Sequence, residues 1–162
     1  MFLNFRAVRP DEAKDILSFY RSLLETEGCV WTLDYPNEQT IEYDLSRSSL
    51  FCLENEQGET VGVISVDDDP EVEKLTCWSA DGAPGAELSR LGVHREYQNR
   101  GIAGLLLQNG MTVLQKRGFK SVHFLVAKDN PKAINAYKKL NFNVVGETFM
   151  FGHEYWCYEK ML

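Results

Sequence analysis

The sequence predicts one α/β (α+β) domain, in which short strands alternate with amphipathic helices over residues 1–162. The clearest signal is a change of hydrophobic period. Residues Leu88–Val93 resemble a buried strand, whereas from Gly101 onward the apolar residues recur at three- and four-residue spacing. A second strand and helix follow from Ser121 and Asn130. Because 162 residues suit one domain and the chain shows no repeat or linker, we expect a single domain.

The first third predicts one strand and two helices. A short strand is expected near Phe2–Val8, and Pro10 then opens a helix that Glu27-Gly28 ends. This helix has a broad apolar face, made by Ile16, Leu17, Phe19, Tyr20, Leu23 and Leu24. Asn37 is a suitable N-cap for a second helix that runs to about Arg47.

The middle of the chain predicts a hairpin that leads to the central strand. Strands at Leu50–Leu53 and Thr60–Val66 flank Asn55-Glu56-Gln57-Gly58, which is a turn signal. The acidic run Asp67–Pro70 reads as a solvated turn, because it lacks the spaced ligands of a calcium loop. Residues 71–86 favour no single element, although 81–85 reads as a loop.

The last third predicts two helices and three strands. Lys116-Arg117-Gly118 ends the helix that starts at Gly101, and a strand covers Ser121–Ala127. Asn130 as N-cap and Pro131 at the first helical position then predict a helix. Two closing strands are expected at about Asn143–Thr148 and Glu154–Lys160.

Composition excludes several classes of protein. The net charge is −7, but residues 1–90 carry a balance of −12 and residues 91–162 a balance of +5. A polyanionic ligand would therefore prefer the second half and a cationic acceptor the first. The acidic total argues against nucleic-acid binding.

No apolar run is long enough to span a membrane, and the N-terminus shows no secretory signal. The four cysteines match no metal or redox spacing, so we expect reduced thiols, no metal and a cytoplasmic location.

The junction between the central strand and its helix predicts an anion site. Small residues at a helix start leave backbone N–H groups unpaired, and the helix dipole adds positive potential there. Neither the dinucleotide fingerprint nor the P-loop pattern is present. The pattern Gln98-x-x-Gly101-x-Ala103 instead resembles the acyl-coenzyme A pyrophosphate loop of the GNAT acetyltransferase superfamily, Q/R-x-x-G-x-G/A.

A second stretch strengthens the resemblance. Asn130-x-x-Ala133-x-x-x-Tyr137-x-x-x-x-Phe142 is similar to the other GNAT signature, with Asn141 in place of the usual glycine. Asn tolerates left-handed backbone angles, so we expect the turn to be kept. The resemblance covers essentially the whole chain. It implies the GNAT fold: a mixed central sheet of about seven strands flanked by four helices, splayed between the central strand and the next.

The resemblance also implies an activity, the transfer of an acetyl group from acetyl-CoA to a primary amine of a small molecule or peptide. No metal is implied, and homodimers are common in the superfamily. The coenzyme diphosphate would be held by backbone amides of Gln98, Asn99, Arg100, Gly101, Ile102, Ala103 and Gly104. Leu91 and Val93 would pair with the pantetheine arm, and Asn130 would help to fix it. The alternatives are a non-catalytic acyl-CoA-binding module and a structural or interaction domain in which the loop binds nothing.

Two residues are candidates for proton transfer. Tyr137 occupies the family's tyrosine position and would protonate the leaving thiolate; otherwise it is a packing residue. Glu87, near the start of the central strand, is the candidate general base. The alternatives are an exposed glutamate at the strand end, a substrate anchor, or an ordered water as the base. Trp31, Tyr35 and His153 are candidates for the acceptor site, although the two aromatic residues also suit the edge of the core.

Overall fold

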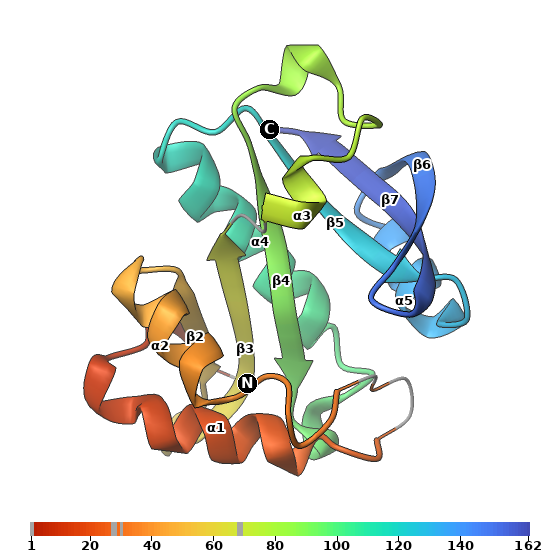
Figure 1. The fold of residues 1–162 in the computed structure, drawn as a ribbon. Helices are drawn as coiled ribbons and strands as arrows, with labels where there is room; N and C mark the ends of the chain where they lie inside the picture. Colours follow the sequence, from red (N-terminus) through yellow and green to blue (C-terminus); the bar gives the residue numbers. More distant parts are fainter. Residues whose placement is uncertain (1, 27–28, 30, 68–69) are drawn as a thin grey trace. The chain divides into compact units, whose positions relative to one another are not determined.

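The computed structural model describes residues 2–26, 29, 31–67 and 70–162 (Figure 1). The strands are β1 (Asn4–Ala7), β2 (Leu50–Glu54), β3 (Thr60–Asp67), β4 (Gly85–Val93), β5 (Ser121–Ala127), β6 (Asn143–Met150) and β7 (His153–Met161). The helices are α1 (Ala13–Ser22), α2 (Glu38–Ser46), the single-turn α3 (Pro70–Glu73), α4 (Ile102–Lys116) and α5 (Pro131–Lys138). No helix within these described ranges is long and apolar enough to cross a membrane.

The strands form one mixed sheet in the order β1-β2-β3-β4-β5-β7-β6. The ladders of β1 with β2, β2 with β3, β5 with β7 and β6 with β7 are antiparallel, whereas β4 runs parallel to β5. This confirms the predicted seven-stranded mixed sheet. The parallel ladder joins Gly85–Glu87 to Ser121–His123. The expected splay between these two strands stays a prediction.

The chain divides into two compact units, which are described separately. The first unit comprises Met1–Val66 and Ser89–Gly110, and the second comprises Asp67–Leu88 and Met111–Leu162. The boundary crosses β4 and α4, so each unit holds one part of both elements.

The core of the first unit lies between α1, α2 and the strands beside them (Figure 1). Helix α1 supplies the expected apolar face, with Ile16, Leu17, Phe19 and Tyr20 buried. Pro10 opens a short 3₁₀ turn before the helix rather than the helix itself. Helix α1 ends at Ser22, and the predicted stop at Glu27-Gly28 lies outside the described residues.

The predicted helix caps are formed. The Asn37 side chain accepts a hydrogen bond from the Thr40 N–H at 3.0 Å, and the Asn130 side chain accepts from the Ala133 N–H at 3.1 Å. Gly118, with φ of 93°, follows α4, and Phe119 N–H closes the end by donating to the Leu114 carbonyl.

The stretch that favoured no single element in the sequence is built from short pieces. Helix α3 is followed by a 3₁₀ turn at Ala80–Gly82, and β4 begins at Gly85, three residues before the predicted start of the central strand. Gly85 was therefore wrongly assigned to a loop. The strand extends because its first residues pair with β5, a long-range contact without local signal. In the predicted acidic turn, Asp67 ends β3, and residues 68 and 69 lie outside the described ranges.

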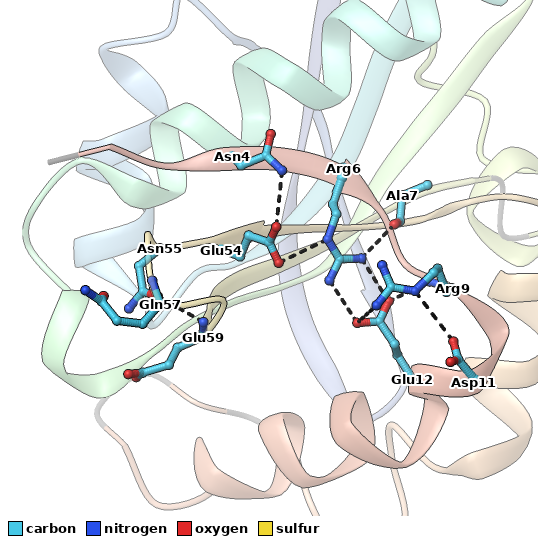
Figure 2. A network of polar contacts seen from close by, with 10 residues as sticks. All are labelled: Asn4, Arg6, Ala7, Arg9, Asp11, Glu12, Glu54, Asn55, Gln57 and Glu59. Carbon is cyan, nitrogen blue, oxygen red and sulfur yellow. Dashed lines mark hydrogen bonds and ion pairs between the residues drawn. The ribbon is translucent and has the colours of Figure 1, made fainter.

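An ion-pair network fixes β1 to the start of the first helix (Figure 2). Arg6 donates two hydrogen bonds of 2.8 Å, one to each carboxylate oxygen of Glu12, and its Nε lies 3.1 Å from Glu54 Oε2. The Glu12 carboxylate also accepts from the Arg9 N–H at 2.8 Å. The Arg6 guanidinium beside it lowers the pKa of Glu12 from 4.5 to about 2.

Replacing Glu12 by Gln should lower the free energy of unfolding by about 1–2 kcal/mol at pH 7, because the paired charge is lost. Since folding depresses the pKa of Glu12, its contribution is present above pH 4.5 and disappears as the pH falls towards about 2. Urea unfolding from pH 7 to pH 2 should show the two proteins converging over this window. Asp11→Asn, which removes a carboxylate that is 81% exposed and 3.7 Å from Arg9, is the matched control and should change nothing. A constant difference between wild type and Glu12→Gln at all pH values would contradict the argument.

Candidate active site

The loop between β4 and α4 is tied to the end of its own strand. A 3₁₀ turn at Arg95–Tyr97 follows the strand, and its N-cap His94 accepts a hydrogen bond from the Glu96 N–H at 3.1 Å. The Gln98 side chain then donates to the Val93 carbonyl at 3.2 Å. Gln98, the first residue of the predicted diphosphate motif, therefore has a structural role, because its side chain ties the loop to the end of the strand.

The same loop presents backbone N–H groups and little side-chain bulk. Asn99 and Gly101 have φ of 63° and 80°, so the chain reverses in a left-handed turn just before Ile102 starts α4. The first N–H groups of an α-helix have no partner within the helix. A Cβ added at Gly101 or Gly104 would meet nothing within 4 Å, so space is open beside these amides. This geometry suits a diphosphate.

Strand β4 is kinked before it reaches the loop. Arg90 has φ of 48°, which is rare for a residue other than glycine within a strand. Two residues later, a Cβ at Gly92 would lie 2.7 Å from Leu23 Cδ1 and 3.2 Å from Trp31 Cη2. Gly92 is therefore required by close packing. Because side chains alternate along a strand, Leu91 and Val93, both half-buried, share the opposite face.

The kinked residue is held by a buried ion pair. Arg90 donates from Nε and Nη2 to the Asp44 carboxylate at 2.8 and 2.6 Å, and Asp44 is fully buried in α2. The guanidinium also reaches Ser65 Oγ and the Tyr35 hydroxyl, each at 3.2 Å. Burial and the Asp44 charge together raise the pKa of Tyr20, whose buried hydroxyl finds no hydrogen-bond partner among the described residues.

A family model for the acetyltransferase (GNAT) family matches residues 16–142, which include both motifs and the kinked strand. The chain belongs to the GNAT acetyltransferase family. Relatives of the chain include an acetyltransferase of Sodalis glossinidius, 27% identical over 152 residues, or 93% of this chain and 94% of the relative. An acetyltransferase of Pectobacterium atrosepticum is 31% identical over 109 residues, or 67% of this chain and 68% of the relative.

Solved structures show the same GNAT fold. A GNAT acetyltransferase from Streptococcus pneumoniae superimposes with a TM-score of 0.77, at 19% identity and 99% coverage of both chains. A protein of Salmonella typhimurium, solved with its cofactor acetyl-CoA, gives a TM-score of 0.73 at 17% identity, covering 99% of this chain and 94% of the other. At such identities the likeness shows the fold.

In the second unit, Asn130 immediately precedes α5 and Tyr137 lies within it. Asn130 caps α5, and the Tyr137 ring contacts Phe124 of β5 edge-on, with ring centroids 4.9 Å apart. The ring also lies 6.4 Å from that of Tyr158 in β7. Burial raises the pKa of Tyr137 to about 12, so the phenol is protonated at neutral pH. Asn141, beyond the end of α5, has φ of 63°, which confirms the expected left-handed turn.

The predicted base Glu87 lies in the same unit, in a row of buried titratable side chains. It is buried in β4 and pairs in register with His123 of β5, which in turn pairs with Glu159 of β7. His123 Nε2 lies 2.6 Å from Glu73 Oε1, and its ring stacks on Trp78 at 4.4 Å. The sequence did not reveal this histidine–carboxylate pair, because 50 residues separate its members.

The three residues predicted for the acceptor site belong to different units, and their shared role stays a prediction. Trp31 packs edge-on against Tyr20, with ring centroids 5.2 Å apart, as expected of a residue at the core edge. Tyr35 is 47% exposed and carries the hydroxyl that Arg90 contacts. Both lie in the first unit, whereas His153 begins β7 in the second, exposed, with its ring 6.2 Å from that of Tyr155.

Two arginines near the loop have structural roles. Arg95 donates to the carbonyls of Ser22 and Leu24 at 3.0 and 3.2 Å, so it caps the end of α1. Local sequence could not reveal this role of Arg95, because its partners are more than 70 positions away. The Arg100 guanidinium lies over the Tyr97 ring, 5.4 Å from its centroid.

Within the ranges that the structure describes, no group of three or more His, Cys, Asp or Glu side chains suits a metal ion.

Replacing Asp44 by Ala should lower the free energy of unfolding by about 3–5 kcal/mol, because the buried Arg90 guanidinium then loses its counter-charge. The double variant Asp44→Leu with Arg90→Met removes both charges and should recover most of this loss. Chemical denaturation of the three proteins at one pH measures the difference. A loss below about 1 kcal/mol for the single variant would mean that the pair behaves like an exposed one.

Proposed function

We propose that this GNAT domain transfers the acetyl group of acetyl-CoA to a primary amine of a small molecule or peptide, by direct attack in a ternary complex. The observation that carries the proposal is the amide-lined turn between β4 and α4, with open space beside Gly101 and Gly104. The acidic first half of the chain favours a cationic acceptor.

The coenzyme would lie along the strand and the loop. The amides from Gln98 to Gly104 would hold the diphosphate, aided by the dipole of the 15-residue α4. Leu91 and Val93, on the strand face opposite Gly92, would pair with the pantetheine arm as an added strand would. Asn130 would help to fix the arm beyond its role as a cap.

The proposed chemistry needs two proton transfers. An alkyl amine has a pKa of about 10.4 and is protonated at neutral pH, so it must lose a proton before it attacks the thioester. Glu87 would accept that proton, directly or through water, and backbone N–H groups of β4 would stabilise the tetrahedral oxyanion. Tyr137 would protonate the departing coenzyme thiolate, and its raised pKa keeps it a proton donor throughout the neutral range.

A panel of primary amines should release free coenzyme A thiol from acetyl-CoA, detected with a thiol reagent. Ala103→Glu places bulk and negative charge in the proposed diphosphate cradle and should weaken acetyl-CoA binding by about 100-fold or more. Gln115→Glu makes the same charge change at an exposed position further along α4 and should leave binding unchanged.

Two results would count against this function. Tight acetyl-CoA binding without thiol release across the panel would indicate a non-catalytic acyl-CoA-binding module. Equal binding by Ala103→Glu and Gln115→Glu would remove the loop as the coenzyme site.

Tyr137→Phe and Glu87→Gln should separate the two proton transfers. Tyr137→Phe should lower kcat by about 10- to 100-fold with acetyl-CoA affinity retained. Its pH–rate profile below pH 10 should keep the wild-type shape, because a group with a pKa of about 12 does not titrate there. Glu87→Gln should instead remove the rise of kcat/KM on the acidic side. An unchanged kcat in the first variant, or an unshifted profile in the second, would withdraw that residue from the mechanism.

A further inference from the structure

Two cysteines that lie 80 positions apart meet in the second unit. In the β6–β7 ladder, Gly146 pairs directly with Cys157. A Cβ added at Gly146 would lie 2.8 Å from Cys77 Cβ and 3.5 Å from Cys77 Sγ. Directly opposed residues in an antiparallel pair have Cβ positions about 4.5–5.5 Å apart on the same face. Cys77 therefore occupies the space left by the missing Gly146 side chain, beside the Cys157 thiol.

The Cys77 side chain thus lies next to the Cys157 thiol. Burial, together with the neighbouring Cys77 thiol, raises the pKa of Cys157, so Cys157 stays a protonated thiol at neutral pH. Cys77 is only half-buried, whereas Cys157 is fully buried. The sulfur that a small reagent reaches first is therefore Cys77.

Neighbouring contacts hold Cys77 in place. The Trp78 ring stacks on His123 of β5, and its Nε1 donates to the Val72 carbonyl at 2.9 Å. The Ser79 N–H and hydroxyl donate to the Glu159 carboxylate at 3.0 and 2.6 Å. Cys157 and Glu159 share one face of β7, so the Cys77–Ser79 segment lies across that face. The contacts of Trp78 and Ser79 hold the Cys77 thiol in position there.

We propose that Cys77 and Cys157 are an oxidative modification site, which closes to an intramolecular disulfide when a small hydroperoxide reaches Cys77. In the first step, the Cys77 thiolate attacks one peroxide oxygen. The O–O bond breaks, and Cys77 becomes a sulfenic acid. In the second, the Cys157 sulfur attacks the Cys77 sulfur and gives up its proton to the departing hydroxyl, so the S–H and S–O bonds break, the S–S bond forms and water leaves. Two thiols thus lose two electrons and two protons, and hydrogen peroxide is reduced to two waters.

The chain contains its own reference thiols. Cys29 and Cys52 lie in the first unit, and Cys52 is buried, with burial raising its pKa to about 11. Like Cys157, Cys52 is too buried for a peroxide to attack directly, but it lies in the other unit from Cys77, so it should stay reduced. Cys29 should react without forming the same cross-link.

The test is to treat the reduced full chain with hydrogen peroxide, alkylate the remaining thiols and map peptides without reduction. The Cys77–Cys157 cross-link should exceed any other cysteine pair by about tenfold, because the two thiols are held at high effective concentration. Cys77→Ser and Cys157→Ser should each abolish it, and Cys29→Ser should retain it.

Gly146→Ala keeps all four thiols and should slow formation of the cross-link by about tenfold, because the added Cβ displaces Cys77. This variant tests the geometry even if Cys157→Ser fails to fold. Over-oxidation of Cys77 without a cross-link, comparable yields of other pairs, or an unchanged rate in Gly146→Ala would each overturn the proposal.

Discussion

The structure depends on a backbone constraint at the end of β4. The strand must stop, reverse through left-handed residues at Asn99 and Gly101, and start α4 with its amides unobstructed. No side chain in the described part of the chain covers this turn, since a Cβ added at Gly101 or Gly104 would meet no atom beyond the local backbone within 4 Å. A helix start of this kind attracts anions without any charged side chain. The arginine next to it, Arg100, instead covers Tyr97.

The kink upstream of the turn is kept by a buried charge pair. A residue such as Arg90 at positive φ costs about 1–3 kcal/mol, so the surrounding structure must hold it there. The Asp44 carboxylate does so with two short hydrogen bonds from a fully buried position. The same guanidinium contacts Tyr35, so one side chain connects the kinked strand, α2 and the loop before α2.

Features that depend on one or a few neighbouring residues were predicted from the sequence. Features that depend on contacts between residues far apart in the chain were missed. Helix caps at Asn37 and Asn130 and the left-handed Asn141 follow from the chemistry of single residues, and the structure has all three. The start of β4 and the capping role of Arg95 were missed, because both arise from contacts between segments far apart in sequence. The His123–Glu73 pair and the contact of Cys77 with Cys157 were hidden for the same reason. The roles of the site residues stay predictions.

The proposed function depends on backbone amides at the β4–α4 junction binding the diphosphate of acetyl-CoA, and a comparison of two ligands tests this. Calorimetric titration of the unmodified protein is carried out with acetyl-CoA and, separately, with S-acetylpantetheine, which carries the same thioester but lacks the diphosphate and the adenosine 3′-phosphate attached to it. Acetyl-CoA should bind about 100-fold more tightly or better, because the charge-assisted hydrogen bonds to its phosphates are lost in the truncated ligand. Equal affinity for the two ligands, or no heat with acetyl-CoA, would contradict it.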